Sequence, residues 1–542
     1  MTTPSEAPKR PRALLAAVVL ASAVVSGGWL VEHGLTGGRL AASNTGAILF
    51  DEVYQHISRD FVDTLQDSTL YNRAIDGLVG ELHDPHSNYL SPKTLAQLSE
   101  KTTGRYAGVG AQIDVRDGWI TIVAPMPGGP AVDAGILTGD RIIEVDGKPL
   151  HDVSVEEAQK ALRGTPGSVV RVSIERPGIA APLKFALTRR EIKVRSVQHA
   201  EMLRDHVGYV ALTIFSEESE PDLRRAIDSL RTAGMTSLIF DLRGDPGGLL
   251  DQGVGIADLF LNAGQRIVSM HGRSPSMSRS FEDRAPQAWP NMPIVALVDN
   301  NSASAAEIVA GALQDHDRAL IVGTTTYGKG SAQNVFPLNN GGAVKLTTAL
   351  WFTPSGRSIN KGRIGSDSAV DFTDSTKKRP VFKTDAGRTV YGGGGITPDV
   401  IVPPPKIAAP DSVFATALGS KVPQFRDALT DYALSLKSSK AITSPDFVVT
   451  PAMRAELLRR MEARGIKVDA ATYNGAAVLI DRQLGTEISR YVFGDATEYS
   501  RRLHGDPTVN KALELIDGVT TQQELLRRAS TPVEKTQSGG DV

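Results

Sequence analysis

The chain has 542 residues, of which 41% are hydrophobic and 22% are charged. This ordinary globular composition excludes wholesale disorder, a collagen-like fibre and a polytopic membrane protein, and the length predicts several domains. The formal net charge of −2 gives no general attraction to nucleic acid, and the absence of cysteine excludes disulfides, thiolate metal sites and a cysteine nucleophile.

The N-terminus has the features of a targeting segment. Lys9, Arg10 and Arg12 precede an uncharged apolar run at residues 14–31. A signal peptide has an apolar region of about 7–15 residues and a membrane-spanning helix needs about 17–25, so a cleaved signal peptide and a retained anchor both stay open. Because basic residues stay on the cytoplasmic side, either one predicts an exported, periplasmic or otherwise extracytoplasmic protein. The second also predicts anchoring to the inner membrane by residues 14–31.

Hydrophobic periodicity changes several times along the chain. Residues 44–100 have apolar residues at helical spacing, and residues 104–191 change to short apolar strands and turns. Residues 207–360 alternate strand and helix, which predicts α/β layers around a mainly parallel sheet. Residues 363–390 are polar and predict an exposed insertion, and residues 411–530 return to helix.

The predicted fold class is an α/β core with a mainly parallel sheet, a small mostly-β domain and flanking helical regions. The predicted segments are a signal peptide or anchor at 1–35, an N-terminal helical region at 36–103, the mostly-β domain at 104–191, the α/β core at 192–405, a C-terminal helical region at 406–530 and a disordered tail at 531–542.

Three loops of the α/β core follow buried strands. These strands are predicted at residues 238–242, 294–298 and 320–322. In a parallel sheet, ligands bind beyond the carboxyl ends of the strands, so we expect the three loops to converge there.

The second of these loops leads to Ser304, at the start of a helix with one apolar face. A serine at that position is usually only a helix cap. The small neighbours Ala303 and Ala305 would also leave space for a substrate backbone, and the free amides of a helix N-terminus can bind a developing oxyanion. On these residues alone, a cap and a nucleophile both stay open.

The third loop contains Lys329. Residues 323–331 nearly spell a phosphate-binding loop, but Gly330 stands where the magnesium-binding hydroxyl belongs and a strand is predicted to follow, so ATP binding is rejected. A lysine between glycines is usually a solvated surface group. If this lysine is instead buried and faces Ser304, desolvation lowers its pKa, and the neutral amine can accept the serine proton without a histidine. The nearest histidine, His316, is expected to face away at the far end of the helix.

The first loop, residues 241–248, is rich in glycine. Its sequence is Asp-Leu-Arg-Gly-Asp-Pro-Gly-Gly. The loop is either a plain turn or a backbone segment that presents an N–H group toward the same cleft, as half of an oxyanion hole.

Together, the three loops resemble the carboxyl-terminal processing peptidases, also called tail-specific proteases. That family shows Asp-Leu-Arg-x-Asn-Pro-Gly-Gly, then a segment with [Ser/Thr]-Ala-Ser-Ala-x-Glu, then Tyr/Phe-Gly-Lys-Gly-x-x-Gln, which match residues 241–248, 300–307 and 327–333. Asp245 stands where asparagine is usual, and this change is expected to have little effect because the backbone does the work there. The resemblance covers roughly residues 45–405 and fades in the C-terminal helices.

The resemblance implies a role for each matched side chain. Ser304 would be the nucleophile, Lys329 the general base and Gln333 the residue that orients the lysine. The oxyanion hole would be formed by backbone amides, those of Ala305 and of either Gly247 or Gly248. No metal ion or cofactor is implied.

Residues 104–191 resemble a PDZ domain, and residues 84–90 before it also match the family. The loop that would bind a peptide carboxylate is formed by Tyr106, Ala107, Gly108, Val109 and Gly110. A chain terminus can add there as an extra strand with its carboxylate on backbone amides, which implies protein substrates with free, apolar C-termini. The two glycines are otherwise explained by a tight turn. Whether this domain activates or inhibits the enzyme stays open.

The sequence thus predicts an exported serine endopeptidase with a Ser-Lys-Gln centre that cleaves other exported proteins near their C-termini. The alternative is a catalytically silent PDZ scaffold of the same family. By analogy with the family, the N-terminal helical region could form a homodimer. No nucleic acid partner is expected.

Overall fold

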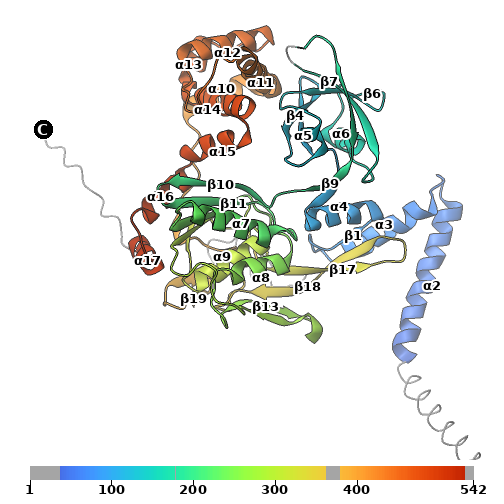
Figure 1. Cartoon of the computed structure of the whole chain (residues 1–542). Helices are drawn as coiled ribbons and strands as arrows, with labels where there is room; N and C mark the ends of the chain where they lie inside the picture. The colour runs from blue at the N-terminus through green and yellow to red at the C-terminus, as the bar shows by residue number, and fades with distance from the viewer. Residues whose placement is uncertain (1–36, 177–178, 362–378, 531–542) are drawn as a thin grey trace, which may run out of the picture. The chain divides into compact units, whose positions relative to one another are not determined.

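Figure 1 shows the computed structural model, which describes residues 37–176, 179–361 and 379–530. The described residues fall into two compact units, divided between His83 and Asp84. The predicted targeting segment, most of the predicted polar insertion and the predicted tail lie outside the described residues, and the segment boundaries stay predictions. In the three described ranges, no helix is both long enough and apolar enough to cross a membrane.

The first unit is helical, as predicted. The rings of Tyr54 and Tyr71 stack with centroids 4.3 Å apart and join its two helices, α2 (Gly37–Asp60) and α3 (Asp67–Gly80). Apolar side chains on α2 are exposed, among them Ile48, Val53 and Ile57. The predicted homodimer is not tested by a single chain and stays a prediction.

A six-stranded sheet forms the centre of the second unit (Figure 1). Its strands, in spatial order, are β10 (Val197–Arg204), β11 (Val207–Leu212), β12 (Ser237–Asp241), β15 (Ile294–Val298), β16 (Leu320–Gly323) and β21 (Val400–Ile401). β10 and β11 are antiparallel, and the remaining neighbours pair in parallel. The prediction of an α/β core with a mainly parallel sheet is therefore confirmed.

Successive side chains of the central strands enter two apolar layers on opposite faces of the sheet. Within β12, Phe240 packs in one layer and Ile239 in the other. The first layer packs on three helices, α7 (Ser219–Thr232), α8 (Leu250–Asp258) and α9 (Ala305–Asp315). The second packs on two helices from the end of the chain, α16 (Pro507–Ile516) and α17 (Gln522–Ser530). The C-terminal region thus completes the core of the sheet.

A second sheet of five strands is antiparallel. Its strands are β14 (Arg279–Glu282), β13 (Arg266–Gly272), β18 (Ala343–Phe352), β17 (Ser331–Pro337) and β1 (Asn88–Leu90). The last two both pair with β18. β1 lies within residues 44–100, which the sequence predicts to be helical, so that prediction is wrong at 88–90, and helix resumes in α4 (Pro92–Thr103). The strand forms by pairing with residues 343–345 of β18, a contact between distant residues that local spacing does not show.

Within the expected exposed insertion, most of the described residues 379–390 are exposed, with a few exceptions. Val390 is buried, and the guanidinium of Arg388 bonds to the core carboxylates of Asp317 and Asp399. The polar composition suggested exposure, but ion pairs allow a charged side chain to be withdrawn from water. The segment forms a hairpin of β19 (Val381–Lys383) and β20 (Thr389–Tyr391).

The mostly-β domain has a six-stranded antiparallel sheet with β3 at one edge. The strands are β3 (Ala111–Arg116), β4 (Trp119–Pro125), β5 (Arg141–Val145), β6 (Lys148–Pro149), β7 (Val169–Glu175) and β8 (Leu183–Thr188). Asp146 and Gly147 form the predicted tight turn, with φ of 49° and 80°. Beside the sheet lie helix α6 (Val155–Leu162) and a separate pair of strands, β2 (Arg105–Gly108) and β9 (Arg190–Lys193).

The chain is again helical toward its end, as predicted. The helices before α16 are α10 (Ala409–Leu418), α11 (Val422–Ser439), α12 (Pro451–Ala463), α13 (Ala470–Gly475), α14 (Ala477–Ile488) and α15 (Asp495–His504). On α12 the buried stripe is Met453, Leu457 and Met461. Ala452 is exposed, because positions four residues apart share a helix face and Ala452 is out of step with them.

Candidate active site

The three loops that follow β12, β15 and β16 meet at the carboxyl edge of the central sheet. The amide of Ala303 donates to the carbonyl of Asp245 at 2.9 Å, and the amide of Tyr327 donates to the carbonyl of Ser302 at 3.0 Å. The hydroxyl of Ser302 donates to the carbonyl of Leu242 at 2.8 Å. The second loop is therefore bonded to both of the others, as the sheet topology predicts.

Ser304 is the N-cap residue of α9 and is half-buried. Its backbone has φ 55° and ψ −113°, outside the regions that residues other than glycine ordinarily occupy. Strained residues of this kind persist only where the surrounding structure fixes them, and they cluster at functional sites.

Glu307, in the first turn of α9, is fully buried and holds two of the loops together. One carboxylate oxygen accepts from the Thr326 hydroxyl at 2.5 Å and from the Gly328 amide at 2.7 Å. The other accepts from the amides of Ser304 and Lys329, both at 2.9 Å. Burial raises the pKa of Glu307, and the four donors oppose this shift because they favour the ionised form. A single oxygen thus joins the main chains of Ser304 and Lys329.

The side chain of Lys329 is partly withdrawn from solvent. Burial lowers its pKa and the positive charge of Lys345 lowers it further, while the carboxylates of Glu307 and Asp84 act in the opposite direction. The net shift is downward, so the neutral amine forms at a lower pH than in an exposed lysine. His316 caps the opposite end of α9, as expected.

Gln333 lies on β17, and its amide group is part of a chain of hydrogen bonds. Its Nε2 donates to the hydroxyl oxygens of Ser331 and Thr347 at 3.0 and 3.1 Å. The Thr347 amide donates to Oγ of Ser87, whose hydroxyl donates to Asp84 at 2.5 Å. Because both protons of Nε2 have acceptors, the carbonyl oxygen of Gln333 is the end of the group suited to accept from a lysine.

Gly247 lies close to the nucleophile loop, and Gly248 pairs with Phe215. A Cβ on Gly247 would lie 2.8 Å from the amide nitrogen of Ala305 and 2.9 Å from Cβ of Ser304, so only glycine allows this approach. The Gly247 amide donates to Oδ1 of Asp245 at 2.7 Å. Within the described ranges, the amides of Gly248 and Ala305 have no acceptor. Of the three amides predicted for an oxyanion hole, these two are free.

A groove of about 350 Å³ lies at the predicted peptide-binding loop; most of its lining comes from the mostly-β domain, and Val194, Gln198 and Asp495 line it from outside that domain. Four of the five predicted residues line it, namely Tyr106, Gly108, Val109 and Gly110, whereas Ala107 does not. The guanidinium of Arg163 also lines the groove and lies 4.8 Å from the centre of the Tyr106 ring. In the part of the chain that the structure describes, the amides of Val109 and Gly110 have no acceptor.

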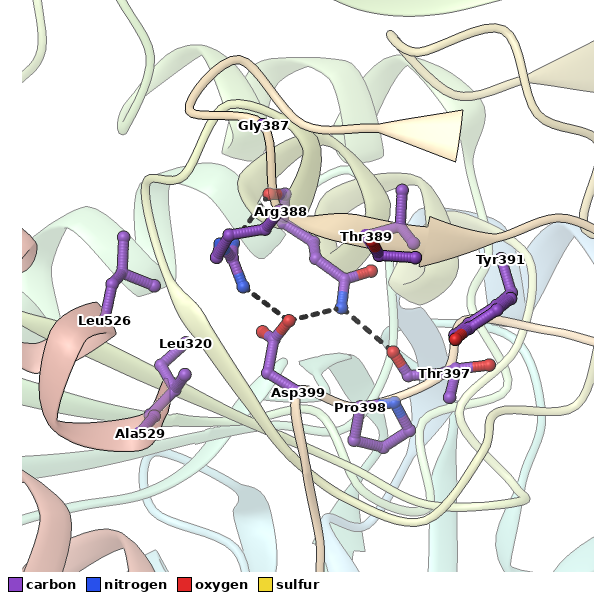
Figure 2. Close-up of a pocket in the computed structure, with 12 residues that line it drawn as sticks. Leu320, Gly387, Arg388, Thr389, Tyr391, Thr397, Pro398, Asp399, Leu526 and Ala529 are labelled. Carbon is purple, nitrogen blue, oxygen red and sulfur yellow. Dashed lines mark hydrogen bonds and ion pairs between the residues drawn. The ribbon is translucent and has the colours of Figure 1, made fainter. Parts of the chain in front are cut away.

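A larger pocket, of about 470 Å³, lies between the β19–β20 hairpin and α17 (Figure 2). It contains none of the predicted site residues. Figure 2 shows Arg388 and Asp399 directed toward each other, and Asp399 also accepts from Gln314 and from the Ile321 amide. These polar groups satisfy one another and serve the fold. Among the described residues, no group of three or more His, Cys, Asp or Glu side chains is placed to hold a metal ion.

Two residues contribute to the site without a predicted role. Glu307 belongs to the matched motif, and a serine followed three residues later by glutamate is also the signature of a helix capping box. Ser87 lies in the matched segment 84–90 and reaches Gln333 through Thr347. No local pattern predicts this second contact, because Ser87 and Thr347 are 260 residues apart.

Known protein families match the chain in three places. The model of peptidase family S41 matches residues 206–370, that of a PDZ domain matches 121–176, and that of the activating protease CtpB N-terminal domain matches 42–94. A carboxy-terminal-processing protease of Bartonella bacilliformis is 37% identical over 326 residues, which are 59% of this chain and 74% of that protein. The carboxy-terminal processing protease CtpA of Bacillus subtilis is 34% identical over 355 residues, which are 65% of this chain and 75% of that protein.

A solved structure of a photosystem II D1 C-terminal processing protease is 27% identical, with a TM-score of 0.36, and covers 67% of this chain and 94% of that chain. The family models and the two curated relatives agree on one class of enzyme. The mostly-β domain is a PDZ domain, and the chain is a serine-type endopeptidase rather than only a scaffold. The chain belongs to the carboxy-terminal processing proteases of peptidase family S41.

Proposed function

We propose that the chain is an exported protease in which Ser304 is the nucleophile, Lys329 the general base and Gln333 the residue that orients the lysine. Its substrates would be other exported proteins, cleaved near their C-termini. The observation that carries this proposal is the single Glu307 oxygen shared by the amides of Ser304 and Lys329. The strained backbone of Ser304 and the lowered pKa of Lys329 support the same roles.

In the proposed mechanism, neutral Lys329 accepts the proton of Ser304 as the serine oxygen attacks the substrate carbonyl. The protonated lysine then gives its proton to the leaving amine, which leaves an acyl-enzyme. Water attacks the acyl group with the same lysine as base, and the serine is released. Gln333 accepts a hydrogen bond from the lysine with its carbonyl oxygen and so directs the amine toward Ser304.

The oxyanion of each tetrahedral intermediate would bind the amides of Gly248 and Ala305. Gly247 is the less suitable glycine, because its amide already donates to Asp245. Ala305 is the first residue of α9, where an amide has no intrahelical acceptor and the helix dipole favours negative charge. Amides held in this way stabilise the oxyanion without reorienting during the reaction.

We expect kcat/KM to rise with pH along a limb set by Lys329. Because burial and Lys345 lower the pKa of Lys329, the limb should lie below the pH at which an exposed lysine loses its proton. Lys345→Gln removes a positive charge, so it should move the limb to higher pH. Steady-state cleavage of a fluorogenic peptide across pH measures this limb in the unaltered enzyme and in Lys345→Gln. A flat profile, with chemistry rate-limiting, would count against a titrating lysine.

We infer that the PDZ groove recognises the C-terminus of the substrate. Strand β3 lies at the edge of its sheet, where an extended peptide can pair with it. The free amides of Val109 and Gly110 are suited to a carboxylate, and the guanidinium of Arg163, which is also ion-paired with Glu100, adds positive charge to the groove. The groove is also lined by Ile113 and Leu162, which favours an apolar terminal side chain.

A substrate with a free apolar C-terminus should be cleaved roughly 10- to 100-fold faster than the same chain with an amidated end, because hydrogen bonds to a charged group contribute about 1.5–3 kcal/mol. Gly108→Val should erase the difference, since a Cβ there would lie 3.0 Å from the Tyr106 ring in the groove. Gly505→Val is the matched control, because nothing lies within 4 Å of its Cβ position. Equal cleavage of both substrates by the unaltered enzyme would rule out recognition of the terminus.

We propose that residues 1–35 export the protein, on the basis of the basic residues followed by the apolar run. The chain without them should be soluble and active but should stay in the cytoplasm, whereas the whole chain should reach the extracytoplasmic side. Cell fractionation compares the two, and N-terminal mass spectrometry of the exported protein distinguishes cleavage from anchoring. An insoluble shortened chain, or one that is still exported, would contradict this role.

A further inference from the structure

Asp245 is a buried carboxyl group that uses only part of its hydrogen-bonding capacity. It has no exposed surface. Its Oδ1 accepts from the Gly247 amide at 2.7 Å, and its carbonyl accepts from the Ala303 amide at 2.9 Å. Its Oδ2 is buried and has no partner within the described residues. Asp245 thus connects the glycine loop to the nucleophile loop and keeps one side-chain oxygen unbonded.

The charged groups around Asp245 are engaged elsewhere. On its own loop, Asp241 and Arg243 bond to each other. On the facing loop, Asp299 accepts from the Gly244 amide, and on α9 the carboxylate of Glu307 is bound by its four donors. Only burial and the Gly247 amide shift the pKa of Asp245, so no neighbouring cation favours its ionised form.

We propose that Asp245 is a positioning residue that works as a neutral carboxylic acid: it holds Gly247 so that the next amide, that of Gly248, faces the oxyanion, and loss of its proton turns the site off. This inference rests on the proposed function, because it uses the proposed oxyanion hole. An asparagine, usual at this position in the family, keeps the bond to Gly247 without an ionisable proton. The expectation that Asp245 has little effect considered only the backbone of the loop. Its side chain also accepts a hydrogen bond within the loop, from the amide of Gly247.

Burial raises the pKa of Asp245 to about 8, and the bond from Gly247 opposes this only in part. The group is therefore neutral around pH 7 and ionises in mildly alkaline solution. The ionised form would place an unpaired negative charge beneath the loops on which a negative oxyanion must form. Both the folded state and the transition state are then less favourable.

The first test is the pH profile of kcat/KM for Asp245→Asn. The rising limb of Lys329 is common to both enzymes, so the test uses their ratio: near pH 8, kcat/KM of the unaltered enzyme should begin to fall relative to that of Asp245→Asn, by about tenfold per pH unit as the neutral acid is depleted. Below that pH, Asp245→Asn should keep the activity of the unaltered enzyme. Asp245→Leu, which cannot accept from Gly247, should lower kcat/KM at every pH. A ratio that does not change with pH overturns the proposal.

The second test measures stability in the Ser304→Ala background and needs no activity. An aspartate with a raised folded pKa keeps its proton in the folded state from its unfolded pKa of about 4 up to about 8, so stability falls as pH rises through that range. The Tm gain from Asp245→Asn should therefore grow from pH 4 to pH 8 and then stay constant. A gain that does not depend on pH overturns the proposal. Normal activity of Ser304→Ala would instead overturn the proposed function and leave this result standing.

Asp283 provides a control outside the three site loops, because it is also a buried carboxyl group with a raised pKa, although it has the Asp258 carboxylate as a neighbour. It is buried, its Oδ1 accepts from the amide of Ala285, and its Oδ2 has no partner among the described residues. Burial and the neighbouring Asp258 carboxylate raise its pKa to about 6, and the bond from Ala285 opposes them. Asp283→Asn should gain stability only between about pH 4 and pH 6 and should keep the fall of kcat/KM near pH 8 relative to Asp245→Asn. Loss of this fall in both variants would indicate a general stability effect and overturn the assignment to Asp245.

Discussion

Ser304→Ala and Lys329→Ala are each expected to lower kcat/KM by roughly 10⁴-fold or more while the fold persists. Each variant removes one partner of the proton transfer that forms the acyl-enzyme. The backbone of Ser304 is held through its amide by Glu307, and alanine keeps that amide, so the loop should stay in place. Mass spectrometry of a cleaved unfolded substrate measures turnover, and thermal unfolding of the same samples measures stability.

Two further variants test whether Ser304 and Lys329 act together and whether Lys329 acts as a base. The double variant of Ser304 and Lys329 should be no less active than either single variant, because the two side chains act as one unit. Lys329→Arg keeps a positive charge but stays protonated, so it should be as inactive as Lys329→Ala. Turnover by either lysine variant at the rate of the unaltered enzyme would refute Lys329 as the base.

Local sequence patterns predicted the parts of the fold that depend on neighbouring residues. The turn at Asp146 and Gly147 requires positive φ angles, which these residue types tolerate, and it forms as expected. The strands that end before the three site loops are continuous apolar runs, as expected for a parallel sheet covered on both faces. The convergence of the loops follows from this topology alone.

Contacts between distant segments could not be predicted in the same way. The apolar stripes of α16 and α17 indicated burial, but nothing in them indicated that they cover the second face of the central sheet. In the same way, the expectation of helix across residues 44–100 missed a strand at 88–90 that pairs with β18. Through Ser87, this segment supports Gln333, so the missed contact bears on the candidate site itself.

Glu307 joins the loops of the site through four hydrogen bonds to its one carboxylate. Its two oxygens receive only donors: a hydroxyl and an amide on one, and two amides on the other. An ionised carboxylate satisfies all four donors, since each oxygen can accept more than one hydrogen bond. Glutamine has nearly the same shape but only one accepting oxygen. In either orientation of the glutamine amide, its NH₂ group would face at least one backbone N–H group, so that two donors meet and the backbone N–H has no acceptor.

We expect Glu307→Gln to destabilise the fold by roughly 2–5 kcal/mol, because buried donors left without an acceptor cost about 1–3 kcal/mol each. In the folded fraction, kcat/KM should fall by about 100-fold or more, since displacement of reacting groups by about 1 Å has that effect. The displaced groups are Ser304 and Lys329, whose amides lose a common acceptor. Denaturant unfolding and active-site titration measure the two effects separately.

Glu487→Gln is the matched control for this variant. Glu487 is also buried and accepts from a threonine hydroxyl, that of Thr430, but it lies on α14 among the C-terminal helices. Its substitution should lower stability and leave kcat/KM of the folded enzyme unchanged. If Glu307 served only the fold, the two variants would behave alike. Equal kcat/KM in folded Glu307→Gln and in the unaltered enzyme would show that the shared acceptor does not set the geometry of Ser304 and Lys329.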